Sequence, residues 1–302
     1  MFGNGVKAYY TDSTAQYDII DPNFPTEFVK GWAYLDGTLY VMKKDCSIIG
    51  TQNLDDPSIW DPLNLIVANI EPGEGVALTK HLSYVIALKQ WDVEVFYDAG
   101  NPTGSPLKAV EGAKAGYGCV SADSVQEIDD ELFWLTSNRT VSPQVVKMSN
   151  LQVSVISTPA IDRQLDRADF SDVFSWVFKH GGHKFYGLTV KNADITLVYD
   201  ISQNLWYQWT DADGHYWPIV DHTFNGDFEH LCQHETNGKI YLLEGDYAYP
   251  NDDGVIVPVD IYAPNYDGGV NRKKQLSKMY FNADQTKGST LFVRHSEDDY
   301  QS

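Results

Sequence analysis

The stretch that most constrains the fold is residues 182–209, with the sequence GHKFYGLTVKNADITLVYDISQNLWYQW. Residues 184–190 and 195–199 are rich in β-branched and aromatic side chains, and the polar residues between them predict a turn. After a second polar turn, residues 205–209 alternate large apolar with polar side chains, as a half-buried strand does. An isolated meander of three strands would be marginally stable in water, so we expect the motif to recur.

Similar hydrophobic strands recur around Tyr40, Tyr84, Phe133, Phe185 and Ile240. Their spacings are 44, 49, 52 and 55 residues, and no helix-forming stretch is long enough to fill the gaps. Repeats of this length predict an all-β fold of the β-propeller class, built of meander blades that start near these five positions. The uneven spacing leaves a β-sandwich with long loops as an alternative.

The pattern changes after Gly254, so we expect two domains. Residues 1–254 are predicted to form the propeller, and residues 255–302 a smaller C-terminal β extension, whose completeness the sequence leaves open. Within the extension, strands are predicted around residues 254–262, 278–282 and 291–295.

One short helix is predicted between two blades. Thr158 is a suitable N-cap, Pro159 suits the first helical position, and Ile161 and Leu165 would share one face of a helix that runs to about Ala168.

The charge balance excludes a protein that grips nucleic acid over most of its surface. The chain has 42 acidic and 22 basic residues, for a formal net charge of -20, whereas binding to phosphates requires clustered basic groups. One basic cluster, formed by Arg272, Lys273, Lys274 and Lys278, is a candidate interaction site. A solvated turn, or a contact for an acidic neighbour, is the simpler interpretation of this cluster.

Three cysteines, Cys46, Cys119 and Cys232, are far apart in the sequence and are expected to be reduced thiols of a protein folded in a cytosol. The chain contains no apolar run of about 18 residues, and its start lacks the pattern of a secretion signal. We therefore expect no membrane insertion by this chain.

An enzyme built on a propeller, such as a sialidase or another glycoside hydrolase, is a rival interpretation. A sialidase needs clustered arginines, and this chain has only five, which are spread along the sequence. Residues 211–217, DADGHYW, resemble the aspartate box of sialidases but lack the residue between Asp213 and Gly214. These two residues predict a hairpin turn. We expect no enzymatic activity, no catalytic residue and no cofactor.

A metal site is a further candidate, because His230, Cys232 and His234 alternate and would project from one face of a strand. His222 and Glu229 are near in sequence, but no fourth ligand falls at a recognised spacing. Packing is therefore the favoured interpretation, and no metal is expected.

A receptor-binding or glycan-binding propeller is another alternative, in which Trp32, Trp60 and Trp217 would serve as stacking platforms. Packing between blades is favoured, because that packing requires bulky aromatic side chains. Within the strand at 205–209, Trp206 and Trp209 are three residues apart and should face opposite sides of the sheet. At most one of them should then lie in the same layer as Phe185.

Five segments together resemble the packaged-DNA stabilisation proteins of short-tailed bacteriophages, which are tail accessory proteins also described as tail hub or nozzle proteins. The similarity runs in order over about two thirds of the chain. It is carried by TQNLDDPSIWDPLNLIVANIEPGE (51–74), VEVFYDAG (93–100), GYGCVSADSVQEIDDELFWLT (116–136), VISTPAID (155–162) and GHKFYGLT to NLWYQW (182–209).

This resemblance implies a structural protein of the virion tail, assembled in the host bacterial cytoplasm. It implies a homo-oligomeric ring, with six copies below the portal, that contacts the portal or an adaptor and other tail proteins. The ring would retain packaged DNA and let it pass without tight binding during ejection. Members of the family usually extend further at the N-terminus, which leaves the C-terminal region, another chain or residues beyond this sequence as sources of strands that close the propeller.

Overall fold

The computed structural model describes residues 2–12, 14–136, 142–166, 168–226, 230–243, 251–252, 254–256, 278, 280 and 292–293. The chain divides into two units, Met1–Val257 and Pro258–Ser302. The strands predicted around residues 278–282 and 291–295 lie almost entirely outside the described residues, so the C-terminal extension remains a prediction. All the described helices and strands lie in the first unit.

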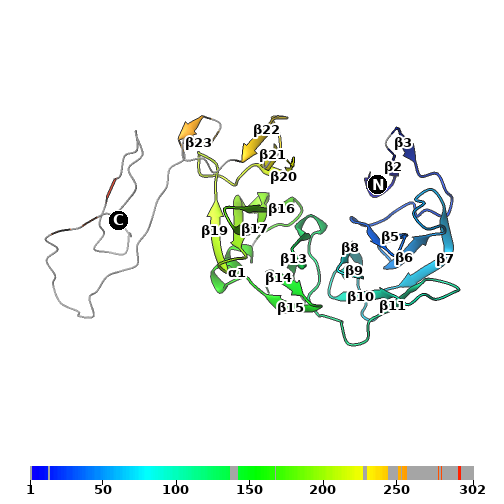
Figure 1. Cartoon of the computed structure of the whole chain (residues 1–302). Helices are drawn as coiled ribbons and strands as arrows, with labels where there is room; N and C mark the ends of the chain where they lie inside the picture. Colours follow the sequence, from blue (N-terminus) through cyan, green and yellow to red (C-terminus); the bar gives the residue numbers. More distant parts are fainter. Residues whose placement is uncertain are drawn as a thin grey trace. The chain divides into compact units, whose positions relative to one another are not determined.

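The described fold is all-β, and its sheets follow one another in chain order (Figure 1). Four sheets have four antiparallel strands each. The first two are β4 (Ala33–Leu35), β5 (Thr38–Met42), β6 (Ser47–Thr51) and β7 (Trp60–Val67), then β8 (Gly75–His81), β9 (Tyr84–Lys89), β10 (Val93–Asp98) and β11 (Leu107–Ala109). The next two are β12 (Gln126–Ile128), β13 (Glu131–Thr136), β14 (Gln144–Ser149) and β15 (Gln152–Val155), then β16 (Val173–His180), β17 (His183–Val190), β18 (Ile195–Asp200) and β19 (Leu205–Trp209).

Smaller sheets flank these four in sequence. A three-stranded sheet of β1 (Phe2–Gly3), β2 (Ala8–Thr11) and β3 (Gln16–Asp18) precedes them. Another, of β20 (Ile219–Phe224), β21 (His230–His234) and β22 (Ile240–Leu243), follows them, and β23 (Asn251–Asp252) pairs with β24 (Val255–Ile256). Every sheet is a meander of consecutive strands, as predicted for propeller blades, and no pairing among the described strands joins the first sheet to the last.

The predicted repeat positions lie inside the sheets and not at their starts. Tyr40, Tyr84, Phe133 and Phe185 lie in the second strand of their sheets, whereas Ile240 lies in the third strand of its own. The first strands were missed because several are short or lack a continuous apolar run, as β12 (QEI) illustrates. The four-stranded sheets therefore begin one strand earlier than the sequence pattern indicates, and the last three-stranded sheet begins two strands earlier.

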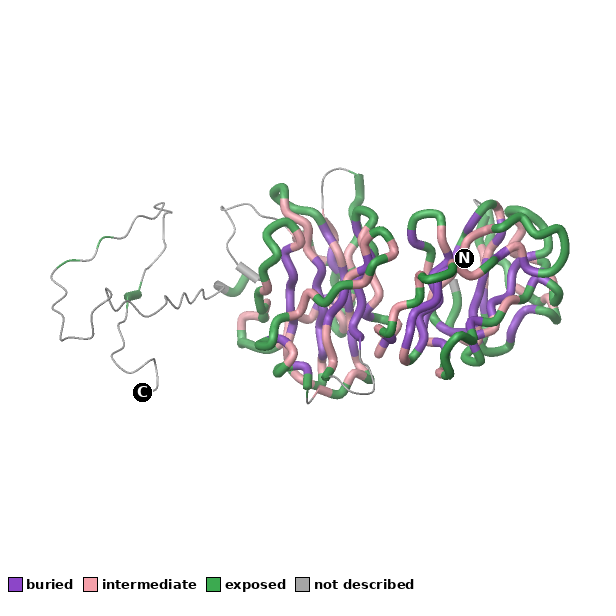
Figure 2. Tube along the Cα trace, turned by 90° about the horizontal axis from the view of Figure 1, so that it is seen from below, coloured by how far each residue is buried: buried purple, intermediate pink, exposed green. Residues whose placement is uncertain are grey.

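Alternating side chains of each sheet pack against the two neighbouring sheets. In β13, Phe133 packs in a cluster with Tyr186 of the following sheet, while Trp134 packs with Ile86 of the preceding one. Buried residues run along the strands and exposed residues gather at the turns (Figure 2). Successive side chains of a strand thus point to opposite neighbours, and both faces of the sheet are covered. This is the packing expected of stacked blades.

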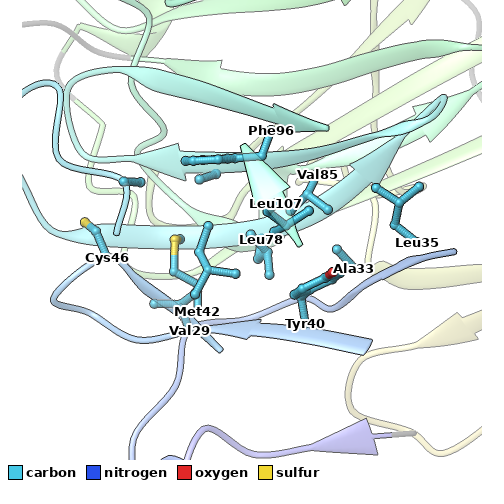
Figure 3. Packing of buried hydrophobic residues seen from close by; sticks show 13 residues of the cluster. Val29, Ala33, Leu35, Tyr40, Met42, Cys46, Leu78, Val85, Phe96 and Leu107 are labelled. Atoms are coloured by element: carbon cyan, nitrogen blue, oxygen red, sulfur yellow. The ribbon is translucent and has the colours of Figure 1, made fainter. Parts of the chain in front are cut away.

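The junction between the first two four-stranded sheets shows this packing in detail. Tyr40 and Met42 of β5 point toward Leu78 of β8 and Phe96 of β10 (Figure 3). All four side chains are at most 1% exposed. Burying side chains of this size contributes about 1.5 to 3 kcal/mol each, so such junctions hold consecutive sheets together.

The opposite orientation of the two tryptophans of β19 is confirmed. Trp206 packs on the side of Tyr199 and donates from Nε1 to the Ile156 carbonyl at 2.9 Å. Trp209 packs on the other side, in the cluster that contains Phe185. Both indoles are only partly buried, so truncation of either should cost less than the roughly 3 to 5 kcal/mol of a fully buried tryptophan.

The predicted helix is confirmed as α1 (Pro159–Leu165), with Thr158 as its N-cap and with Ile161 and Leu165 buried. It ends before Ala168, and its buried face packs into the junction between the third and fourth four-stranded sheets. No helix among the described residues is long and apolar enough to span a membrane.

Candidate functional site at the first strands and sheet junctions

The first strands of consecutive sheets contact one another, which places their side chains on a shared surface. Lys30, three positions before β4, forms a parallel bridge with Ala77 of β8, and its carbonyl accepts from the Leu78 amide at 3.0 Å. Contacts also join β12 to β16 and β16 to β20. We call the surface formed by β4, β8, β12, β16, β20 and the residues preceding them the first-strand surface.

Polar side chains link these strands. His81 of β8 is fully buried, and its Nδ1 lies 2.9 Å from Oε1 of Glu127 on β12. Gln126 of β12 donates from Nε2 to the carbonyl of Ser175 on β16 at 2.9 Å. The Ser175 hydroxyl in turn donates to the carbonyl of Asp123, in the 3-10 helix η1 (Ala122–Ser124). Side-chain hydrogen bonds therefore fix the register between three consecutive sheets.

Several lysines near this surface are paired with carboxylates. Lys30 pairs with Asp123, 93 positions further along the chain. Lys179 and Lys184 both pair with Asp129, and their ammonium groups hold the pKa of that carboxyl below its ordinary value. Eight lysines of the described chain lie within ion-pair distance of a carboxylate: Lys30, Lys43, Lys89, Lys114, Lys147, Lys179, Lys184 and Lys191. Their positive charges are thus largely neutralised within the protein.

The proposed basic interaction cluster is not placed. Arg272, Lys273 and Lys274 lie outside the described residues, and of Lys278 the structure describes only that it is exposed. Its role as an interaction site therefore remains a prediction.

The metal candidates His230, Cys232 and His234 lie on β21, and each has its own surroundings. His230 Nδ1 is 2.9 Å from Nε2 of His222, whereas His234 Nδ1 accepts from the Thr236 amide at 3.2 Å. Cys232 is buried, and burial raises the pKa of its thiol to about 11. Glu229 lies outside the described residues. The part of the chain that the structure describes has no group of three His, Cys, Asp or Glu residues arranged to hold a metal ion.

The segment that resembles an aspartate box is a closed turn. Oδ1 of Asp211 accepts from the amides of Asp213 and His215 at 3.0 and 2.9 Å. Gly214 has φ +89°, a left-handed conformation that glycine adopts without strain, and a bridge between Thr210 and Tyr216 closes the loop. The Asp211 carboxylate is therefore engaged in shaping its own loop.

The tryptophans considered as glycan platforms lie in sheet junctions. Trp60 is fully buried and donates from Nε1 to the Pro57 carbonyl at 3.0 Å. Trp32 packs against the same cluster, and Trp217 packs against Trp176 with ring centroids 5.1 Å apart. Packing between sheets, the interpretation favoured from the sequence, accounts for all three.

Comparisons with solved structures find only remote likeness. The extracellular domain of the putative hybrid two component system BT4673 from B. thetaiotaomicron is 10% identical, with a TM-score of 0.46 over 81% of this chain and 31% of that chain. A chain of a mitotic checkpoint complex is 9% identical, with a TM-score of 0.49 over 78% of this chain and 69% of the other. The present chain thus spans about a third of the length of the first of these structures.

Sequence comparison is more specific. No curated protein gives a significant match. The family model described as bacteriophage P22 Gp10, beta-propeller, matches residues 3–248, which include the three- and four-stranded sheets described above except for Phe2 of β1. The chain therefore belongs to the bacteriophage P22 Gp10 β-propeller family, a family of phage structural proteins linked to stabilisation of packaged DNA.

Proposed function

We propose that this protein forms a ring of six copies in the virion tail, below the portal, where it retains the packaged genome and lets it pass during ejection. Its neighbours would be the portal or an adaptor protein and other tail proteins, after assembly in the host bacterial cytoplasm. Membership of the Gp10 family supports a structural role in the virion. The ring, its copy number and its neighbours are part of the proposal.

The pairing of lysines with carboxylates is the observation that best supports passage of DNA without tight binding. DNA that must slide past a protein should not be held by many phosphate contacts at once, because each contact adds affinity. The net charge of -20 and the ion pairs of Lys30, Lys179 and Lys184 both act against such contacts. We therefore expect duplex DNA to stay unbound even at low salt.

A charge-neutralising variant tests this reasoning directly. Asp123→Asn, Asp129→Asn and Glu131→Gln together would release four lysines from their ion pairs. The triple variant should gain DNA affinity that falls with salt, with a log–log slope of up to about -3.6 if all four lysines reach phosphates. The measurement is filter binding of duplex DNA across salt concentration.

The matched control carries the same change of charge without releasing a lysine. Asp18→Asn, Glu27→Gln and Glu111→Gln alter exposed carboxylates outside the ion pairs described above. This control should remain unbound. Micromolar binding by the unmodified protein would overturn the sliding mechanism, and equal binding by both triple variants would show that net charge, and not ion pairing, controls affinity.

Assembly is tested separately by light scattering. Copies that each carry a charge of -20 repel one another, so isolated protein should be monomeric at low ionic strength. Rings should form with added salt, at high concentration, or on the neighbouring tail component. Persistent monomers under all three conditions would overturn the ring, whatever the outcome of the DNA experiment.

A further inference from the structure

A layer of aromatic and histidine rings joins the last three-stranded sheet to the sheet β16–β19. On the β16–β19 side the layer contains Trp176, Phe178 and Trp209, and the rings of Trp209 and Trp217 lie 5.1 Å apart. Of the β20–β22 side chains that the structure describes, only those of Ile219 and Cys232 are buried. The β20–β22 sheet is therefore held mainly by contacts across this layer.

Two histidines at the centre of the layer contact each other directly. Nε2 of His222, on β20, lies 2.9 Å from Nδ1 of His230, on β21, and the rings are stacked with centroids 5.1 Å apart. Phe178 of β16 packs against both rings, at 5.6 and 6.0 Å. His180, also on β16, lies edge-on to His230 at 5.9 Å. Three imidazoles from two sheets thus meet at one point.

The hydrogen bond between the two imidazoles limits how many protons they can hold. One ring must donate an N–H while the other offers a lone pair, so the pair can keep its bond with one extra proton but not with two. With both rings charged, two N–H groups would face each other at a separation that suits only donor and acceptor. Double protonation must therefore separate His222 from His230.

Surrounding groups oppose this protonation. Burial, together with the neighbouring His230, lowers the pKa of His222, although the Val177 backbone and Asp221 oppose that shift. Burial and His180 lower the pKa of His230. Because the docked-state pKa values lie below the ordinary 6.5, docking is fully stable above about pH 6.5 and loses stability as pH falls through the lowered pKa values.

Apart from Asp221, the other charged groups that the structure describes at this junction pair elsewhere, as Lys191 does with Glu235 at 3.2 Å. On the β17–β18 side, the Asp200 carboxylate lies 2.6 Å from Nδ1 of His183 and accepts from the Ser202 amide. Asp194 pairs with His215, and this pairing raises the pKa of His215. That exposed ion pair is present at low pH and is lost as pH rises, which is the opposite dependence.

We propose that His222 and His230 form an acid-sensitive latch, which docks the β20–β22 sheet on β16–β19 at neutral pH and releases it on mild acidification. Release exposes the aromatic layer around Trp176 and Trp209. The net charge of the chain would have the opposite effect. Its isoelectric point is about 4.6, so acidification from neutral pH reduces the net negative charge and the repulsion within the protein, which favours the closed state. Release of the β20–β22 sheet on mild acidification therefore distinguishes the histidine latch from an effect of net charge.

Hydrogen exchange measured by mass spectrometry tests the proposal. Peptides from residues 219–243 are compared with peptides from β13 and β14, at about pH 7.5 and about pH 5.5 and with EDTA present, after correction for the intrinsic pH dependence of exchange. The opening equilibrium of residues 219–243 should rise by at least about tenfold, with a limit of about 100-fold per pH unit for two linked protons. The β13 and β14 peptides should stay protected. Tryptophan fluorescence should shift to longer wavelength in parallel.

Variants separate the latch from general acid loosening. His222→Gln with His230→Gln preserves hydrogen-bonding capacity without a titrating group, so opening should become independent of pH between these two values. His180→Gln removes only the neighbouring charge and should reduce the opening at about pH 5.5. His234→Gln, on the same strand but with its ring against Tyr241, is the control and should behave like the unmodified protein.

Two results would overturn the latch. One is equal protection of residues 219–243 in the unmodified protein at both pH values. The other is acid opening that persists unchanged in the variants at His222, His230 and His180. If the double variant does not fold, the single change at His180 still decides the question, because that side chain is exposed and its loss should not prevent folding.

Discussion

Replacing Lys89 by Met should destabilise the protein more than any exchange of an exposed lysine. Lys89 of β9 is fully buried, and its Nζ lies 2.8 Å from Oε1 of Glu94 and 3.2 Å from Oδ1 of Asp92, both nearly inaccessible. It also donates to the Glu71 carbonyl at 2.6 Å. Glu94 accepts from the Ile70 amide as well, so this ion cluster ties a loop to the second four-stranded sheet.

The loss of unfolding free energy in Lys89→Met depends on the buried carboxylates that remain without their lysine. A unit charge pair at 2.8 Å is worth about 6 kcal/mol at an effective dielectric of about 20, and most of this offsets the cost of removing both charges from water. Lys89→Met leaves two buried carboxylates with no cation, for an expected loss of about 3 to 5 kcal/mol. The triple variant that also carries Asp92→Asn and Glu94→Gln removes those charges and should recover much of the loss.

Urea denaturation at about pH 7.5 measures these differences. Lys43→Met is the matched control, because Lys43 pairs with Asp45 at 2.8 Å but is 38% exposed and should lose less than about 1 kcal/mol. A Lys89→Met loss no larger than that of the control would refute the reasoning, as would a triple variant less stable than Lys89→Met alone.

The pH dependence gives a second measurement on the same cluster. Burial alone would lower the pKa of Lys89, but the carboxylates of Glu94 and Asp92 outweigh burial, and the pKa lies above its ordinary value of 10.5. The raised pKa contributes stability that is complete below pH 10.5 and is lost as pH rises through the folded-state value. Lys89→Met should abolish this alkaline loss.

Two glycine substitutions test the close approaches between strands, each read as the change in urea midpoint. Gly31→Ala should cost about 3 kcal/mol, because φ is +89° and the added Cβ would lie 2.1 Å from the Leu78 carbonyl oxygen; a loss below about 1 kcal/mol would mean that the bridge between sheets is not tight. Gly187→Ala should cost about 1 to 3 kcal/mol, because its Cβ would lie 2.2 Å from the Trp176 ring. In a Trp176→Leu background, which lacks the indole ring, Gly187→Ala should cost less than in the unmodified protein, and an equal cost in both would place the strain elsewhere.

Strand content was predictable because it depends on local patterns. The segments around Tyr40, Tyr84, Phe133 and Phe185 have continuous apolar runs, since these second strands are covered on both faces, and such runs are visible in the sequence. The helix cap at Thr158 was visible for the same reason, because it depends on residues adjacent in the chain.

Features that depend on distant contacts were not predictable. Lys89 lies five residues before Glu94, but nothing in the sequence shows that the Glu71 carbonyl also contacts it or that the pair is buried. The contact of Gly31 with Leu78 and the pairing of Lys30 with Asp123 likewise require the arrangement of several sheets. For the histidines, alternation on β21 suggested ligands, whereas the partner of His230 is a ring from the neighbouring strand.

The meander topology also determines the order in which the sheets can fold during synthesis. Every ladder among the described strands joins strands that follow one another in the chain, so each four-stranded sheet can form from one run of consecutive residues, such as 33–67 or 173–209, as it leaves the ribosome. At about 5 to 20 residues per second, one sheet is completed every few seconds. The ion pair between Lys30 and Asp123 spans 93 positions and cannot form until the start of the third four-stranded sheet has emerged. The pair can therefore form only after the first two four-stranded sheets have been synthesised.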